Sequence, residues 1–320
     1  MGRLQAPRLH PRSVDLPPAW RAGVDAIAAD RERGASLLAL DALALLEFAG
    51  KDAPRDARGL GQLADLARAM RSTRPSMPVI ANVVNLAMHE VSLARDAASA
   101  VRACEKAAQS ARDKALEARG GAAREAAALA RGTVLTHSAS ETVTKALRAA
   151  HRGGTLSRVV VAEGRPGLEG RELARTLAAE GVETLLVIDA ALGLHAREAD
   201  VALVGADAVL SDGSLVNKVG TRLLGMACAR AGTPLYAAAD RFKISSATTL
   251  PLEAKAPSEV WPDPPPGVTV RNIYFDRTEA DLVTGIASDS GLLAPNAVAP
   301  MAREHGVWAD WESRVRKMTR

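Results

Sequence analysis

The spacing of apolar residues divides the chain into two regions. Up to about residue 131 they recur every three or four positions with Arg, Glu and Lys between them, which is the spacing of amphipathic helices. We expect helical segments over residues 17–48, 62–71 and 79–131, the last interrupted at Gly120-Gly121. The apolar faces are mostly Ala and no heptad is sustained, so the pattern favours helices packed in a bundle over a coiled coil.

From residue 132 the pattern changes, and short apolar runs alternate with helical segments. We expect strands over residues 133–136, 158–162, 184–188, 201–204, 235–239 and 270–275, and helices over 140–151, 168–180, 216–231 and 279–287. Single helices between successive strands imply right-handed crossovers and a mainly parallel sheet that helices cover on both faces. The sequence therefore predicts an α/β chain, with a helical N-terminal domain (residues 1–131) before a Rossmann-like, doubly wound domain (residues 132–320).

The residues that directly follow three of these strands carry side chains suited to ligand binding. They are His137 to Ser140, Glu163 to Pro166, and Asp207 behind Gly205. Because the carboxyl ends of parallel strands meet at one edge of a sheet, where ligands usually bind, we expect these residues to gather there. Arg165 can hold a phosphate through its planar guanidinium or form a surface salt bridge. Ser138 and Ser140 can bind a phosphate or cap the helix that follows, and we expect Ser140 to do both.

The segment ADVALVGADAVLSDGSLVNKVGT, residues 199–221, collects further polar groups. Its expected strand ends before Asp207, residues 211–214 are typical of a tight turn, and Asn217 and Lys218 lie at the start of the expected helix. A carboxylate, an amide, an ammonium and helix-start amides together suit a phosphorylated or polyhydroxylated ligand. A surface loop followed by a helix cap would give the same pattern, so the segment alone leaves both interpretations open.

Four motifs in order resemble one family. They are TVLTHSAS at residues 133–140, AEGRPGLEG at 162–170, GAD with DGS and NKVGT within 205–221, and IYFDRTEADLVTGI at 273–286. This set is similar to the signature of the family that joins the α, β and δ subunits of eukaryotic initiation factor 2B. Its enzyme members are methylthioribose-1-phosphate isomerase and ribose-1,5-bisphosphate isomerase. The resemblance covers most of residues 133–286 and fits the helical part before it more loosely.

The resemblance assigns roles to single residues. In the isomerases, a cysteine in a Thr-His-Cys motif and the aspartate of GAD act as acid and base that convert an aldose phosphate to its ketose. Asp207 matches that aspartate, and Asn217 with Lys218 matches the pair that holds the sugar hydroxyls. Ser138 stands where the cysteine would be. This departure matters, because a thiol can exchange protons near neutral pH whereas an aliphatic hydroxyl hardly can without a base.

A second departure concerns the phosphate. The enzymes carry a Gly-rich, Arg-containing segment near the amino terminus, and its best counterpart is residues 33–37, where Gly34 matches and the downstream arginine is not obvious. The resemblance also implies a homodimer through the C-terminal domain. Two functions therefore stay open: a protein that binds and isomerises a phosphorylated sugar, or a non-catalytic regulatory protein of the initiation-factor type whose pocket senses a sugar phosphate or nucleotide.

Composition narrows the class of protein further. The formal charge is +4, but Lys and Arg are interspersed with Asp and Glu and aromatic residues are only 3%, so we expect no direct nucleic-acid binding. There is no uninterrupted apolar stretch of the roughly 18 residues that a membrane span needs, which predicts a cytoplasmic protein without membrane contact. No GxGxxG follows the first strand, no Walker loop is present, and neither the histidines nor Cys104 and Cys228 show ligand spacing. We therefore expect no cofactor and no metal.

Overall fold

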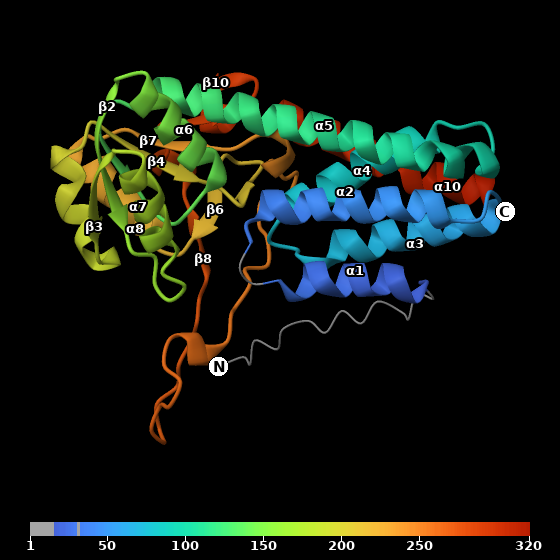
Figure 1. The fold of residues 1–320 in the computed structure, drawn as a ribbon, viewed down its shortest axis with the longest axis horizontal. Helices are drawn as coiled ribbons and strands as arrows, with labels where there is room; N and C mark the ends of the chain where they lie inside the picture. The colour runs from blue at the N-terminus through green and yellow to red at the C-terminus, as the bar shows by residue number, and fades with distance from the viewer. Residues whose placement is uncertain (1–15, 31–32) are drawn as a thin grey trace.

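The computed structural model describes residues 16–30 and 33–320. Its N-terminal part is helical, as expected (Figure 1). The helices there are α1 (Pro18–Ala29), α2 (Ala35–Asp52), α3 (Ala57–Thr73), α4 (Pro78–Ser92) and α5 (Ala97–Leu129). They pack around a core of buried Leu, Val, Met and Ala side chains. None of the helices in the described ranges is long and apolar enough to cross a membrane.

The structure corrects three helix boundaries. The expected helix 17–48 is two helices, α1 and α2, and α3 is longer at both ends than expected. The long Ala-rich stretch is interrupted before Asp96, which caps α5 by accepting a hydrogen bond from the Ser99 amide at 2.7 Å. Helix α5 continues through Gly120-Gly121. Gly121 packs against the turn at Asp289, where a Cβ on residue 121 would come within 2.9 Å of the Asp289 Cα. The glycine thus permits close packing instead of ending the helix.

The second part is built on a seven-stranded sheet whose strand order is β10-β9-β7-β4-β1-β2-β3. Its strands are β1 (Gly132–Thr136), β2 (Leu156–Ala162), β3 (Glu183–Val187), β4 (Val201–Gly205), β7 (Leu235–Ala238), β9 (Gly285–Ser288) and β10 (Gly291–Leu293). All neighbours are parallel except β10, which pairs with β9 in the antiparallel sense. The chain moves outward from β1 to β3, then returns to β4 on the other side of β1, as in doubly wound folds.

Helices cover both faces of this sheet. One face packs on α6 (Glu141–Arg152), α7 (Glu169–Ala179) and the C-terminal part of α5. The other face packs on α8 (Thr221–Ala231), α9 (Ala299–Ala309) and the 3-10 helix η1 (Asp189–Glu198). Successive residues of each strand, such as Val134 and Leu135, belong to the two different cores. The Rossmann-like fold that the sequence predicts is therefore confirmed.

A small antiparallel sheet lies beside the large one, and it includes residues that the sequence predicts to be helical. It consists of β5 (Ala208–Val209), β6 (Leu215–Lys218) and β8 (Phe275–Thr278), in the order β5-β6-β8. The expected helix 216–231 accordingly begins only at Thr221. The strand expected at 270–275 is found further along the chain, as β8, and shares only Phe275 with the expected range. The expected helix 279–287 is wrong: its residues form a 3-10 turn, η4 (Ala280–Leu282), and then β9, whose four residues are all buried.

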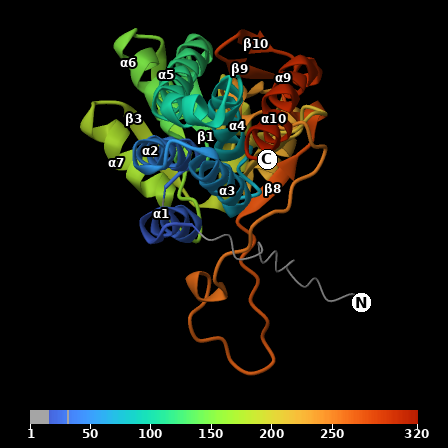
Figure 2. The ribbon, with the colours of Figure 1, turned by 90° about the vertical axis from the view of Figure 1, so that its right-hand side faces the viewer.

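Two further segments leave the α/β domain. The last helix, α10 (Trp311–Met318), returns to the helical core, where the buried Trp311 indole donates to Asn85 Oδ1 at 3.0 Å. The boundary expected at residue 131 falls between α5 and β1, and α10 packs with the helical part although it follows the sheet in sequence. Residues 251–271, which include the short η3 (Pro257–Glu259), are almost all exposed and form an arm that projects from the body (Figures 1 and 2).

Candidate functional site

The candidate site lies where the strand order reverses. β1 and β4 are neighbours, and the chain leaves their carboxyl ends toward opposite sides of the sheet. Such a switch point leaves a crevice at the sheet edge, which is the usual ligand site of this architecture. A cavity of about 300 Å³ lies there, lined by residues after both strands, by the first turns of α2 and α6, and by β6.

Six of the seven site residues that the sequence predicts line this cavity. They are Gly34, Ser138, Ser140, Asp207, Asn217 and Lys218. Arg165 is not among the lining residues: its backbone amide donates to Asp189 Oδ2 at 2.7 Å, and its guanidinium donates to the Val260 carbonyl of the arm at 3.3 Å. The structure therefore does not bring Arg165 together with the other six, and the expected phosphate clamp is not present in this geometry.

Further residues line the cavity that the sequence did not single out. They are, among others, Arg33, Arg74, Glu169, Lys243, Lys255 and Tyr274. Glu169 and Tyr274 belong to motifs that carry the family resemblance, so a signal for them existed. Arg74 at the end of α3 and Lys255 at the base of the arm come from segments without any motif, and only the tertiary fold places them here.

Asp207 occupies the position just past β4 with an unusual electrostatic environment. Burial raises the pKa of its carboxyl from the ordinary value to about 6, against the opposing effects of the Lys243, Arg74 and Lys218 cations. Lys243 itself is buried and donates from Nζ to the carbonyl oxygen of Ala206 at 2.6 Å. A carboxyl with a pKa near 6 can both accept and donate a proton around neutral pH, which suits general acid–base catalysis.

The carboxylate of Glu169 is the centre of a second polar cluster. Its Oε1 lies 2.8 Å from the Lys218 Nζ, accepts a hydrogen bond from the Ser138 hydroxyl at 3.2 Å and accepts another from the Tyr274 hydroxyl at 3.4 Å. The ring of Tyr274 is flanked by two ammonium groups, those of Lys218 at 3.9 Å and Lys255 at 3.5 Å from its centroid. Burial lowers the pKa of Lys255, and burial followed by the Glu169 charge raises that of Tyr274.

Asn217 and Lys218 reach the cavity from strand β6, and not from the start of a helix as the sequence predicted. Asn217 Nδ2 donates to the Thr221 hydroxyl at 3.0 Å, and this hydroxyl donates to the Lys218 carbonyl at 2.7 Å. The two side chains are thus fixed by the turn into α8, in neighbouring positions of one strand. Both are buried, which restricts their rotamers and suits the precise positioning of a ligand.

Two helix starts face the cavity. Ser140 is the N-cap of α6, and its hydroxyl accepts a hydrogen bond from the Val143 amide at 3.4 Å, so the capping half of its expected dual role is confirmed. Gly34 is the N-cap of α2; a Cβ there would meet no atom within 4 Å, so packing does not require a glycine. Amides at helix starts favour anions, and here two such starts converge.

The lining of the cavity carries an excess of positive charge. The cations are Arg33, Arg74, Lys218, Lys243 and Lys255, and the acids are Glu141, Glu169 and Asp207. Among the lining residues, five cations against three carboxyl groups leave a surplus of two positive charges when all are ionised. Two of these cations also pair with acids outside the lining, Arg33 with Asp30 and Asp41, and Arg74 with Glu253. Together with the helix starts, this arrangement can bind an anionic ligand such as a phosphate ester.

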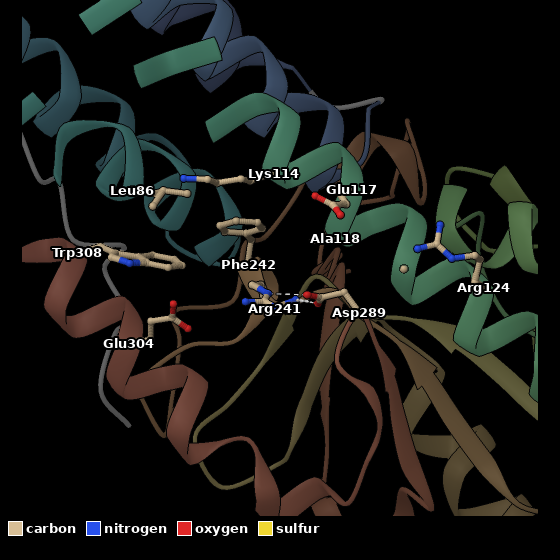
Figure 3. A pocket seen from close by; sticks show the side chains of 11 residues that line it. Leu86, Lys114, Glu117, Ala118, Arg124, Arg241, Phe242, Asp289, Glu304 and Trp308 are labelled. Carbon is tan, nitrogen blue, oxygen red and sulfur yellow. Dashed lines mark hydrogen bonds and ion pairs between the residues drawn. The ribbon is translucent and has the colours of Figure 1, made fainter. Parts of the chain in front are cut away.

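A larger cavity, of about 530 Å³, contains none of the predicted residues. It lies between α4, α5 and α9 (Figure 3), where the aromatic side chains of Phe242 and Trp308 lie among charged side chains. Its charges balance, with Lys114, Arg124 and Arg241 facing Glu117, Asp289 and Glu304. Arg241 is already paired with Asp289, as Figure 3 shows, and Lys114 with Glu90.

Comparisons with known proteins agree with the fold and the motifs. The sequence model of the initiation factor 2 subunit family matches residues 31–295. The ribose 1,5-bisphosphate isomerase of Haloterrigena turkmenica is 31% identical over 316 residues, covering 92% of this chain and 95% of the relative. Other curated relatives match over a shorter part of the chain, which spans 54–60% of their length. One of them, the ribose 1,5-bisphosphate isomerase of Methanocaldococcus jannaschii, is 30% identical over 184 residues, or 56% of this chain.

Solved structures show the same architecture. The translation initiation factor eIF-2B of Pyrococcus horikoshii superposes with a TM-score of 0.77 at 28% identity, covering 88% of this chain and 98% of that one. The 5-methylthioribose 1-phosphate isomerase of the same organism gives 0.71 at 23% identity, covering 90% and 87%, and this supports the fold alone. The chain belongs to the initiation factor 2 subunit family.

Proposed function

We propose that this protein binds a phosphorylated sugar in the cavity at the β1/β4 switch point and isomerises an aldose phosphate to its ketose, with ribose 1,5-bisphosphate as the candidate substrate. The observation that carries the proposal is Asp207, a carboxyl with a pKa of about 6 in a cavity with surplus positive charge. The match to a ribose 1,5-bisphosphate isomerase over nearly the whole chain supports the same choice.

The proposed reaction needs two groups that exchange protons. In the first half, the ring oxygen takes a proton and the C2–H proton leaves, so that a C1=C2 double bond forms as the bond from C1 to the ring oxygen breaks. In the second half, the proton of the C2 hydroxyl leaves, C2=O forms, and C1 takes a proton. No oxidant or reductant is consumed, and each group ends in its starting state. Asp207 is one of the two groups in this proposal, and it serves the oxygens because its carboxyl is partly protonated near neutral pH.

Binding is assigned to the rest of the lining. Ser140 and the first turns of α2 at Gly34 and of α6 would hold a phosphate, supported by Lys255. Asn217 and Lys218 would orient the sugar hydroxyls from β6. Arg165 has no part in this assignment, since its side chain contacts the arm.

One observation favours a second candidate function. Ser138 stands where the related isomerases have a cysteine, and a hydroxyl exchanges protons poorly on its own. A protein that keeps the cavity but lacks turnover would bind the same ligands and serve as a sensor of the initiation-factor type.

Two measurements on the purified protein separate these functions. Thermal shift with ribose 1,5-bisphosphate, methylthioribose 1-phosphate and unphosphorylated ribose tests binding, and the formation of ketose is followed by NMR. We expect stabilisation by a phosphorylated sugar but not by ribose, together with ketose formation. Stabilisation without ketose would support the sensor, and the absence of any stabilisation would contradict both candidates.

A further inference from the structure

We infer that Glu169 is the second proton-exchanging group of this site, acting through the Ser138 hydroxyl in place of the family's thiol. The inference rests on the proposed isomerase function and names a residue to which neither the motifs nor the comparisons give a role. Glu169 lines the cavity and accepts the Ser138 hydroxyl proton in a 3.2 Å hydrogen bond. A hydroxyl that hands its proton to a carboxylate can accept another one from the substrate at the same time.

The backbone around Ser138 is held in the conformation that makes this contact. Ser138 has φ +67°, a left-handed conformation that is uncommon for a residue other than glycine. Such outliers persist where the surroundings enforce them and concentrate at functional sites. The residue stands directly after β1 and His137, whose Nε2 lies 2.7 Å from the Val219 carbonyl next to β6. The loop is thereby fixed on the strand that also carries Lys218.

Glu169 sits in a space shaped for its carboxylate. The backbone of Gly164 and Gly167 lies close to it: a Cβ at Gly164 would come within 3.2 Å of the carboxylate carbon, and one at Gly167 within 2.7 Å of Oε2. Within the described residues, Oε2 is buried and has no hydrogen-bond partner. The protein contacts of the carboxylate, including that of the Ser138 hydroxyl, are therefore all made by Oε1.

The other contacts of Oε1 keep Glu169 in place without occupying Ser138. The Lys218 ammonium at 2.8 Å balances the carboxylate charge. Tyr274, whose pKa is raised by burial, remains a hydrogen-bond donor at neutral pH. The carboxylate therefore faces Ser138 from a fixed direction, as a proton relay requires.

The proton balance is simple. In the first half-reaction, the proton of C2 passes to Ser138 Oγ as the Ser138 proton passes to Glu169, while Asp207 protonates the ring oxygen. In the second half, Glu169 returns its proton to Ser138, Ser138 delivers one to C1, and Asp207 takes the proton of the C2 hydroxyl. Both carboxyl groups and the hydroxyl end as they began, and the net change is the transfer of hydrogen from C2 to C1 and from O2 to the ring oxygen.

The test is a double-mutant cycle on turnover of ribose 1,5-bisphosphate with the full chain. It compares wild type, Glu169→Gln, Ser138→Cys and the double variant, with Glu172→Gln as a control on the exposed face of the same helix. Because a thiol exchanges protons without help, we expect Glu169→Gln to lower kcat by about 10²–10⁴-fold in the Ser138 background but by less than about tenfold in the Ser138→Cys background. Thermal shift with the substrate checks that each variant still folds and binds.

The outcomes distinguish this inference from the function on which it rests. If the wild type forms no ketose, the proposed function fails. If the wild type is active and Glu169→Gln is equally active, Glu169 exchanges no proton. If Glu169→Gln reduces kcat equally in both backgrounds, Glu169 only holds Lys218 and Tyr274, and the relay is overturned. Loss confined to the Ser138 background supports the relay, since a merely structural role would not depend on the atom at position 138.

Discussion

The two cavities of this protein differ in size and in charge, and charge is the more informative property. The larger cavity, between α5 and α9, has as many cations as acids among its lining residues. The smaller cavity has surplus positive charge, two helix starts and a carboxyl whose pKa is shifted to about 6. Ion pairs occur in both cavities, and in the smaller one Arg74 pairs with Glu253 and Lys218 with Glu169. The difference is therefore the number of lining charges of each sign and the raised pKa of Asp207, and a shifted pKa in a cavity is typical of a functional site.

Position in the fold explains the difference. The smaller cavity lies at the switch point between β1 and β4, where loops leave the sheet on both sides and their polar residues converge. The larger one lies where α5 passes over the turn after β9, and most of its lining residues belong to the helices α4, α5 and α9. Substitutions of the same chemical kind in the two cavities should therefore have different effects.

The largest contrast is expected for loss of an acid. Asp207→Asn removes a group that exchanges protons and should lower kcat for ribose 1,5-bisphosphate by about 10²–10⁴-fold. Glu304→Gln, which removes an acid from the larger cavity, should leave kcat within about twofold, because its carboxylate is exposed at the rim. Equal losses in both variants, or none in either, would remove the functional distinction between the cavities.

The second contrast concerns stability and pH. The raised pKa of Asp207 means that the folded state binds its proton more tightly than the unfolded chain does. Proton binding by Asp207 contributes fully to the free energy of unfolding below about pH 4. This contribution, at most about 3 kcal/mol, is lost as the pH rises toward and past 6. We expect Asp207→Asn to exceed the wild type in free energy of unfolding at pH 7.5 and to match it near pH 4, in denaturant titrations at both values. A difference that does not change with pH would contradict the shifted pKa.

A third contrast tests the positive charge. Lys255→Met takes one cation from the smaller cavity and should weaken binding of ribose 1,5-bisphosphate about tenfold or more, the effect of one charge-assisted hydrogen bond. The matched change in the larger cavity, Lys114→Met, should leave Kd unchanged. Isothermal titration at constant ionic strength measures both, and comparable weakening by the two variants would mean that the protein attracts the anion only through its overall field.

The smallest effect is expected at a helix cap. Ser140→Ala should lower the free energy of unfolding by about 1 kcal/mol through loss of the cap of α6. Asp96→Ala, which removes the cap of α5 away from both cavities, should cost a similar amount. Only Ser140→Ala should also weaken ligand binding, and unaltered binding would reduce Ser140 to a cap.

Much of the site was predictable because it follows from the order of strands. Asp207 and Ser138 directly follow short apolar runs, and parallel strands bring such positions together regardless of what lies between them. Asn217 and Lys218 line the cavity, but from a strand and not from the expected helix start. Their strand forms through pairing with β8, where Lys218 lies opposite Phe275, and local periodicity carries no information on a partner so far along the chain.

The positions of the Arg165 and Lys255 side chains, which the sequence did not predict, have a related cause. The loop after β2 is tied at its backbone to Asp189, and this directs the Arg165 side chain to the arm instead of the cavity. Lys255 reaches the cavity only because the arm folds back at its base, next to Tyr274. Both placements depend on tertiary contacts between segments that have no shared pattern in sequence.

The most direct test of the account follows ribose 1,5-bisphosphate by NMR in deuterated water, with wild type, Asp207→Asn and Glu304→Gln side by side. We predict that the wild type and Glu304→Gln form the ketose, and that Asp207→Asn binds the sugar but forms product at least about a hundredfold more slowly. No ketose from the wild type, or equal product formation by Asp207→Asn, would contradict the claim that the smaller cavity is an isomerase site.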